Sequence, residues 1–280
     1  IHIQDVAGKL QAYVKSDRIP ENIYDAVVRN LDLGDLIGIE GTMFYTKTGE
    51  FTINASNIDI LSKNIRPLPN LKEKDGEAFN AFEDKELRYR NRHLDLIANP
   101  EVKDIFKKRA QIISSLRKEL DKLGYIEVET PVLQNLYGGA SARPFKTFHN
   151  SLEQNFYLRI ADELYLKRLI VGGFNQIYEI AKNFRNEGMD RNHNPEFTAL
   201  EFYQAYADVY EMMDITELIL KAVSRQLDNT VLSFSGHKIN IDQPFKRETV
   251  FGLLNESTGK NVDELDEIGL SKLAKDLSIQ

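Results

Sequence analysis

The chain of 280 residues contains no cysteine, which excludes disulfides, thiolate zinc sites and cysteine nucleophiles. It has no apolar run of roughly eighteen residues or more, so it offers no transmembrane helix. Its first ten residues lack the basic and apolar stretches of a signal peptide. These absences fit a cytoplasmic protein with no membrane partner. We also find no internal repeat and no low-complexity segment.

Basic residues are outnumbered by acidic ones, 36 to 43, and the net charge is −7. Proteins that bind nucleic acid usually carry a basic patch, so the overall charge argues against such a partner. Net charge does not report on local patches, which keeps that argument weak. The length and a hydrophobic content of 42% are enough for two domains with cores.

Residues 1–66 have the pattern of a small β domain. Alternating residues predict strands at 1–5, 9–14, 36–45, 51–55 and 58–62, and a helix is expected over 22–31. Short strands with one central helix favour an OB-type barrel, a fold often used for single-stranded nucleic acid, or another small barrel. Because Ile1 already lies inside a strand, we expect the first barrel strand to be missing from the sequence.

A linker is expected over residues 67–100. It opens with Pro67 and Pro69 and continues as a charged, weakly patterned connector to residue 86. Residues 86–96 are basic with interleaved aromatics. They could contact RNA phosphates, or form a helix packed between domains.

Residues 101–280 alternate long helices with strands. Apolar residues at three- and four-residue spacing predict a helix over 101–123, stopped by Gly124. A strand is expected at 125–130, and Asp162 is expected to cap a helix over 163–171. Beyond it we expect a strand at 174–181, a helix over 209–227, a hairpin at 232–241 and two further helical stretches from 250 and 262.

Residues 183–208 combine unusual chemistry with a strand–loop–strand pattern, in which the loop covers 188–195. Charged side chains gather near one mouth of this hairpin: Arg185, Glu187, Arg191, His193 and Glu201. Guanidinium groups and a histidine suit a polyphosphate, and Phe197 could stack on a base. The carboxylates could hold an ammonium group or a magnesium ion. The alternative is a surface hairpin with weak ion pairs.

The string FRNEG…HNPEFT…EFYQAYAD closely resembles motif 2 of class II aminoacyl-tRNA synthetases, and of the lysyl enzymes in particular. GGASARPF at 138–145 resembles the loop beside the bound amino acid, although many relatives have proline where this chain has Tyr137. The helix over 101–123, its following strand and Pro131 are similar to motif 1, which forms the dimer interface. Residues 1–66 are similar to the anticodon-binding domain of the lysyl, aspartyl and asparaginyl enzymes.

This resemblance implies an α+β protein with three parts. An N-terminal OB-type β-barrel at 1–66 lacks its first strand, a linker covers 67–100, and residues 101–280 form a class II antiparallel-sheet catalytic domain flanked by helices and incomplete at its C-terminus. The implied activity is ATP-dependent activation of L-lysine to lysyl-adenylate and transfer to the 3′ end of tRNA(Lys). Magnesium with ATP, and a homodimer through motif 1, are implied as well.

The resemblance also assigns roles to residues. Arg185 is the expected catalytic arginine, which bridges the amino-acid carboxylate and the α-phosphate. The other expected ATP contacts are Glu187 and Asn194 at the adenine end, Phe197 stacked on adenine and His193 at the outer phosphates. The expected lysine contacts are Gly139 and Glu163 at the α-amino group and Glu201 and Tyr203 at the side chain. Gln11 and Glu50 match positions that read anticodon bases.

One family motif is missing. No G-x-G-x-G-x-x-R lies between Asp208 and Gln280. The acidic residues that ligate magnesium are therefore expected beyond Gln280, no metal ligand is assigned, and the chain is expected to be a shortened form with impaired activity. An asparaginyl or aspartyl enzyme, or a non-catalytic tRNA-binding paralogue, remains an alternative. A protein-modifying lysyl ligase fits less well, because those relatives lack the barrel.

Overall fold

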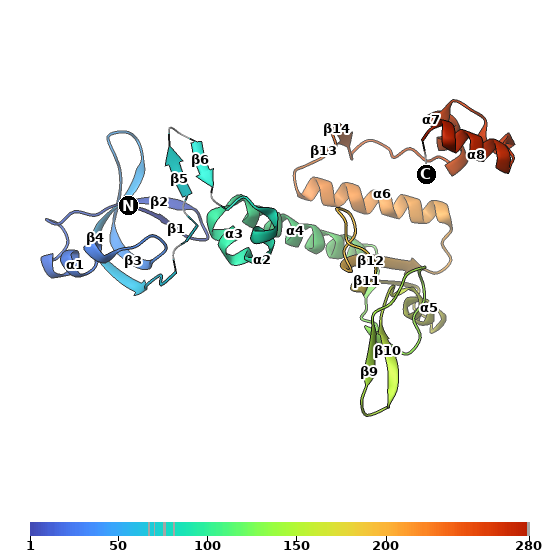
Figure 1. Ribbon diagram of the computed structural model, residues 1–280, viewed down its shortest axis with the longest axis horizontal. Coiled ribbons are helices and arrows are strands. Elements are labelled where there is room, and N and C mark those ends of the chain that lie inside the picture. Colours follow the sequence, from blue (N-terminus) through green and yellow to red (C-terminus); the bar gives the residue numbers. More distant parts are fainter. Residues whose placement is uncertain (67, 70, 75–76, 81, 279–280) are drawn as a thin grey trace. The chain divides into compact units, whose positions relative to one another are not determined.

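The computed structural model describes residues 1–66, 68–69, 71–74, 77–80 and 82–278. They belong to two compact units, Ile1–Lys107 and Lys108–Gln280, whose helices and strands are labelled in Figure 1. The expected linker starts at residue 67 and the expected catalytic segment stops at 280, and both positions lie outside the described residues. Within the described ranges, no helix is long and apolar enough to cross a membrane.

The first unit is built on a four-stranded sheet with the strand order β1-β2-β4-β3. Its strands are β1 (His2–Gln4), β2 (Lys9–Tyr13), β3 (Leu36–Tyr45) and β4 (Phe51–Ser62). β2 runs parallel to β4, and the other neighbours are antiparallel. Helix α1 (Glu21–Ala26) and the 3-10 helix η1 (Val28–Asn30) pack side chains onto Ala55 and Ile58 of β4. The strands predicted at 1–5, 9–14 and 36–45 are thereby confirmed.

Two predicted details of this unit are wrong. The strands expected at 51–55 and 58–62 are one continuous strand, β4, which accommodates one extra residue, Ser56, since Glu40 of β3 pairs with Asn57 and Gly41 pairs with Ala55. A Cβ at Gly41 would lie 2.2 Å from the Asn54 carbonyl oxygen, so glycine permits this close approach. The helix expected over 22–31 breaks at Val27, where two β-branched residues disfavour continuation.

The expected connector contains more regular structure than its composition indicates. β5 (Leu71–Lys74) and β6 (Glu77–Asn80) pair antiparallel, and the helices α2 (Lys85–Arg90) and α3 (Arg92–Ala98) follow. Asp95 is fully buried and accepts hydrogen bonds from Arg88 and Asn99, both at 2.7 Å, and from Arg92. Burial alone would raise the pKa of Asp95, but these partners outweigh it and lower that pKa. Two arginines that could have contacted RNA are therefore engaged within the fold.

The second unit carries most of the remaining elements. Its helices, together with the one that leads into it, are α4 (Glu101–Lys122), α5 (Glu163–Val171), α6 (Val209–Gln226), α7 (Val250–Thr258), the 3-10 helix η2 (Val262–Glu264) and α8 (Glu267–Asp276). Its strands are β7 (Ile126–Glu127), β8 (Leu133–Gln134), β9 (Lys146–His149), β10 (Gln154–Leu158), β11 (Gln176–Phe184), β12 (Glu196–Gln204), β13 (Val231–Phe234) and β14 (His237–Asn240). They form the sheets β12-β11-β7, β8-β10-β9 and β13-β14.

The strand expected at 125–130 is only two residues long. Tyr125 turns into the core, where it is 3% exposed. Thr130 reaches β11 through its side chain instead of a backbone ladder, since its hydroxyl donates to Glu179 at 2.6 Å. The helices and strands predicted for the rest of this unit are confirmed to within a few residues, including the hairpin turn at Ser235 and Gly236.

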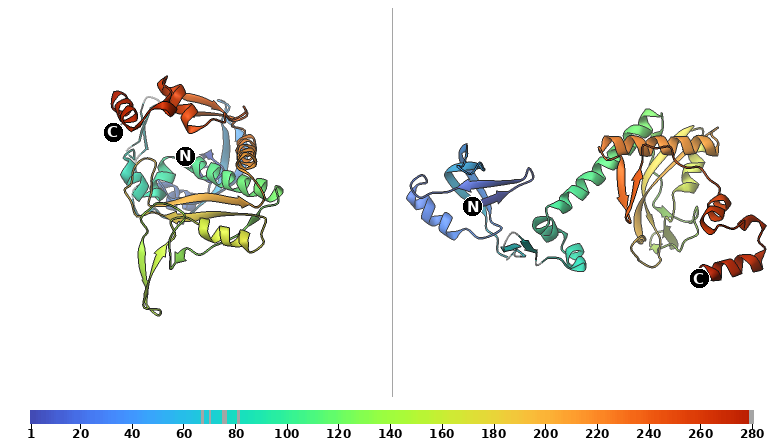
Figure 2. Two further views of the ribbon diagram at one scale, coloured as in Figure 1. Left: turned by 90° about the vertical axis from the view of Figure 1, so that its right-hand side faces the viewer. Right: turned by 90° about the horizontal axis from the view of Figure 1, so that it is seen from above.

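The β11–β12 hairpin has two faces of opposite character. On one face, Tyr178, Ile180 and Phe202 pack against side chains of α4 and α6. On the other face, α5 covers the strands, and there Glu179 lies directly opposite Glu201. Figures 1 and 2 show α4 and α6 on one side of these strands and α5 on the other. The apolar face anchors the sheet, and the polar face is left for chemistry.

We expect Leu120→Ala to destabilise the second unit by about 2–5 kcal/mol, because Leu120 is fully buried between α4 and the apolar face. Urea unfolding followed by circular dichroism measures the change. Leu277→Ala, at a leucine that is 48% exposed, is the matched control and should shift stability by less than about 0.5 kcal/mol. Equal effects of the two variants would contradict this packing.

Candidate active site

The end of β11 and the start of β12 bring Arg185 and Phe197 together. The guanidinium carbon of Arg185 lies 5.1 Å from the centre of the Phe197 ring. Its backbone N–H donates to the Pro195 carbonyl at 2.8 Å, which closes the intervening loop. A fixed cation beside a half-buried aromatic ring can receive a phosphate next to a flat base. This is the pairing that the sequence indicates for a nucleotide.

Glu187 joins the hairpin to the glycine-rich loop at 138–145. Its carboxylate accepts the backbone N–H of Arg143 at 3.2 Å. In return, the backbone N–H of Asn186 donates to the Arg143 carbonyl at 2.7 Å. Two segments that are about forty residues apart in sequence therefore form one wall of the site, a contact that the local pattern does not reveal.

His193 and Asn194 lie on the exposed loop between the two strands. The Nδ1 atom of His193 is 2.8 Å from the Asp190 carboxylate of the same loop. The backbone N–H of Asn192 is the main cause of the lowered pKa of Asp190, followed by the His193 side chain. The structure thus engages His193 within its own loop instead of with Arg185 and Glu187.

Gly139 and Glu163 meet although they come from different segments. Gly139 has φ +87°, and a Cβ there would lie 3.0 Å from the Glu163 Cβ and 3.2 Å from that of Ala161. The positive φ strains any other residue, and a Cβ would push Glu163 and Ala161 away by a few tenths of an ångström, so both features favour glycine. Glu163 stands in the first turn of α5, half-buried, and accepts a hydrogen bond from Lys167 at 2.6 Å. The backbone at Gly139 and the Glu163 carboxylate lie close enough to bind an ammonium group together.

Glu201 and Tyr203 form the second acidic group of the site. The Tyr203 hydroxyl donates to Glu201 at 2.9 Å. Burial, the adjoining Asp162 carboxylate and the more distant Glu163 together raise the pKa of Glu201 to about 7, against an opposing contribution from Tyr203. Burial and the Glu201 carboxylate likewise raise the pKa of Tyr203. Acids with raised pKa values in one cluster are typical of a functional site.

Asp162 was predicted to cap α5, and this prediction is wrong. It occupies the N-cap position, but its side chain makes no capping hydrogen bond. It is fully buried, and its Oδ1 instead accepts the side-chain N–H of Asn183 at 3.2 Å. Neither Asp162 nor Asn183 was predicted to belong to the site. The sequence did show a second acidic residue, Asp162, directly before Glu163. Because an aspartate at that position is also the usual helix cap, its role in the site was overlooked.

A buried ion pair lies beside these residues. Arg159 and Glu179 approach to 2.7 Å, with side chains 4% and 5% exposed. The guanidinium also donates to the Lys182 carbonyl at 2.8 Å, and Thr130 donates to Glu179 at 2.6 Å. With its hydrogen bonds complete, the pair holds the segment before α5 against β11.

Gln11 and Glu50 lie in the first unit and share one patch of its sheet. Gln11 is paired with His2 on one side and Thr52 on the other. Thr52 donates to the Gln11 side chain at 2.8 Å, and Glu50 lies 3.6 Å from His2. The structure therefore brings these two predicted residues together.

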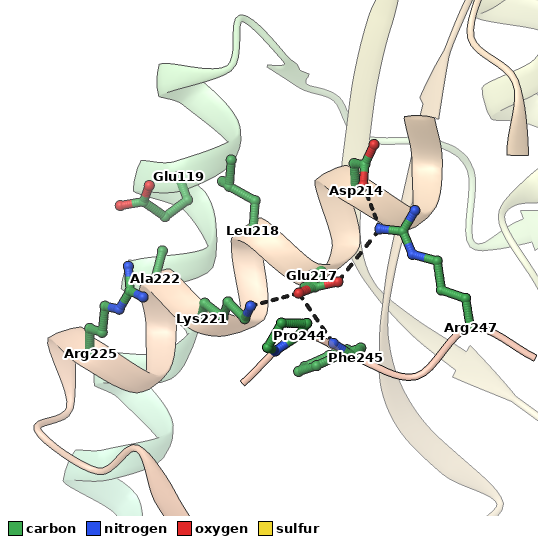
Figure 3. Close-up of a pocket in the computed structure, with 10 residues that line it drawn as sticks. All are labelled: Glu119, Asp214, Glu217, Leu218, Lys221, Ala222, Arg225, Pro244, Phe245 and Arg247. Carbon is green, nitrogen blue, oxygen red and sulfur yellow. Dashed lines mark hydrogen bonds and ion pairs between the residues drawn. The ribbon is translucent and has the colours of Figure 1, made fainter. Parts of the chain in front are cut away.

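A groove of about 650 Å³ lies over α6, and Figure 3 shows the side chains that line it. Glu217 accepts hydrogen bonds from Lys221 at 2.6 Å and from the Phe245 backbone at 3.3 Å. Arg247 pairs with Asp214 and Glu217. Hydrogen bonding from Lys221 is the main cause of the lowered pKa of Glu217. These charges neutralise one another and tie the segment 244–247 to α6, so the groove is not the site of chemistry.

Within the part of the chain that the structure describes, no three His, Asp or Glu side chains are grouped to hold a metal ion.

Comparison with known families gives two matches. A model described as tRNA synthetases class II (D, K and N) matches residues 84–268. A model described as OB-fold nucleic acid binding domain matches residues 1–61.

Similar curated proteins are named lysine–tRNA ligase. Those of two strains of Porphyromonas gingivalis are 47% and 46% identical over the whole chain, which covers 50% of each. That of Azobacteroides pseudotrichonymphae is 46% identical, and the chain covers 57% of it. The chain thus spans about half the length of the curated relatives it matches.

The raised pKa of Glu201 has a consequence for stability. Between its usual pKa of 4.5 and its folded value of about 7, the folded chain binds more protons than the unfolded chain. The free energy of unfolding therefore falls as the pH rises through this window, and the loss is complete above it.

We expect Glu201→Gln to raise the melting temperature by roughly 1–3 °C at pH 8, because it removes the buried charge. At pH 4.5 the variant and the unmodified chain should melt together. Differential scanning calorimetry at both pH values measures this, with Glu264→Gln at an exposed position as the control. A difference in melting temperature that is the same at both pH values would contradict the raised pKa of Glu201.

Proposed function

Because the chain belongs to the class II tRNA synthetases for aspartate, lysine and asparagine, we propose that it serves the activation of L-lysine by ATP and the transfer of lysine to tRNA(Lys). The observation that carries this proposal is the pair of acidic groups on the polar face. Gly139 and Glu163 suit an α-amino group, and Glu201 with Tyr203 suits a second ammonium group.

Two carboxylates match an amino acid with two ammonium groups. A buried ammonium needs hydrogen-bonding acceptors or carboxylates around it. Aspartate would instead place a third carboxylate near Glu201, where like charges repel. Asparagine would leave the Glu201 charge without a partner. The names of the curated relatives agree with this preference.

The proposed reaction has two steps. The lysine carboxylate attacks the α-phosphorus of ATP, so a mixed anhydride forms and pyrophosphate leaves. The 3′-terminal ribose hydroxyl of the tRNA then attacks the lysyl carbonyl, and AMP leaves. Neither step needs a side-chain nucleophile, so the protein acts by positioning and by neutralising charge.

Arg185 is the residue that we assign to the α-phosphate, with Phe197 stacking on adenine. Glu187 and Asn194 are assigned to the adenine end and His193 to the outer phosphates. His193 has to leave Asp190, a surface contact of low strength, to reach a phosphate. Magnesium accompanying ATP is part of the proposal, but the described residues group no ligands for it and no step is assigned to it.

Two macromolecular contacts complete the proposal. The tRNA anticodon is assigned to the sheet of the first unit, at Gln11 and Glu50. A homodimer is assigned to α4 and the strand after it, where Ile112 and Ile126 are 38% and 52% exposed. A cytoplasmic location belongs to the same proposal.

The test is amino-acid-dependent exchange between ATP and pyrophosphate, with lysine, asparagine and aspartate. It is run on this chain and on a version extended to the length of the curated relatives. We expect the extended chain to catalyse exchange with lysine and with neither asparagine nor aspartate, and we expect no exchange by the shorter chain. Arg185→Ala should lower the rate at least about a hundredfold, as for loss of a charge-stabilising donor. Arg168→Ala, at an exposed position in the last turn of α5, should not.

Exchange with asparagine or aspartate in place of lysine would contradict the substrate. Exchange by neither version, with folding intact, would contradict the activity and favour a tRNA-binding paralogue.

A further inference from the structure

Two acceptors are buried on the polar face without a donor. Asp162 is fully buried, and its Oδ2 atom has no hydrogen-bond partner among the described residues. The side-chain oxygen of Asn183, which is 2% exposed, has none within that part of the chain either. A buried acceptor without a donor is destabilising, and more so when it is charged. Two such acceptors side by side indicate that something else supplies a proton or a cation.

The group within reach of Asp162 is another acid. Burial and the neighbouring Asp162 carboxyl raise the pKa of Glu201. Asn183 donates to the other oxygen of Asp162, and Tyr203 donates to Glu201. Two carboxylates so close cannot both be charged without cost, whereas one proton between them satisfies both.

The surrounding charges do not replace that proton. Glu163 adds negative charge, and Lys167 neutralises it at 2.6 Å. On the same face of β11, the Arg159 charge is neutralised by Glu179 at 2.7 Å. Arg185 lies at the far end of the strand, where its guanidinium stands over Phe197.

We propose that Asp162 and Glu201 share one proton in the ligand-free protein and release it when the ammonium group of a cationic amino-acid side chain binds. The inference rests on the proposed function, and it makes Asp162 a specificity-determining residue of the site. The proton leaves to solvent, the pair changes from a charge of −1 to −2, and the ammonium group donates hydrogen bonds to both carboxylates. A neutral side chain of similar length leaves the proton in place and gains no such partners.

The shared proton is tested in the chain without ligand. Carbon-13 NMR of labelled carboxyl groups, assigned with Glu201→Gln and Asp162→Asn, follows the titration from pH 4 to 9. We expect Glu201 to titrate near neutral pH, and Asp162→Asn to lower the Glu201 pKa, although burial still holds it above that of an ordinary glutamate. A Glu201 titration that Asp162→Asn leaves unchanged would overturn the proposal.

Proton release is tested by calorimetric titration of the chain with lysine in two buffers of different ionisation enthalpy. At pH 6 we expect about one proton to be released per lysine bound, and the dissociation constant should fall about tenfold from pH 5.5 to 6.5. With Asp162→Asn, lysine should bind with clearly less proton release than in the unmodified chain and with a correspondingly smaller change in the dissociation constant over that range, because only the burial contribution remains. Asp276→Asn, at an exposed position, is the matched control.

The outcomes separate this inference from the proposed function. Lysine binding with no proton release in the unmodified chain overturns the inference alone. Failure of lysine to bind at pH 8, with a coupled titration still seen by NMR, overturns the release step and leaves the shared proton standing, whereas absence of exchange in the extended chain overturns the proposed function. Thermal melting of both variants checks that they fold.

Discussion

The register of the β11–β12 pair is the constraint on which the second unit depends. Because side chains alternate across a strand, one register places Tyr178 and Phe202 on the face against α4 and α6. The same register places Glu179 and Glu201 opposite each other on the face beneath α5. A slip of one residue would exchange the two faces, which would bury the acids among apolar side chains. The apolar face that packs against the helices and the polar face that carries the acids therefore depend on the same register, and a shift that changes one face also changes the other.

The polar face is costly to fold, and the structure offsets part of that cost locally. Arg159 and Glu179 complete their hydrogen bonds with Thr130 and the Lys182 carbonyl, and breaking such a buried pair costs about 3–5 kcal/mol. Asp162 is different, because no donor among the described residues reaches its second oxygen, for which we propose the proton shared with Glu201. Strain of this kind is tolerated where a ligand relieves it and where a large core supports the other side of the sheet. The fully paired groove over α6 shows the opposite condition, with nothing left for a ligand to satisfy.

Much of the fold could be predicted from local patterns, and the failures have identifiable causes. The spacing of apolar residues and the stop at Gly124 correctly predicted α4, and the polar stretch 188–195 correctly predicted the loop between β11 and β12. The continuity of β4 was missed because Ser56 and Asn57 interrupt the apolar pattern, although β4 accommodates Ser56 as one extra residue opposite Glu40 and Gly41 of β3. Asp162 was misread because local capping chemistry and a long-range contact with Asn183 predict the same residue type at that position. The meeting of Gly139 with Glu163 depends on tertiary packing, which no spacing along the chain reports.

The central claim is that the face of β11–β12 beneath α5 is an amino-acid site for a side chain with an ammonium group. Amide NMR of the chain titrated with millimolar lysine tests it most directly, with norleucine as the uncharged control of similar length. The account predicts shifts at Gly139, Glu163 and Tyr203 with lysine, and much smaller ones with norleucine. Shifts confined to the groove over α6, or equal responses to both ligands, would contradict it.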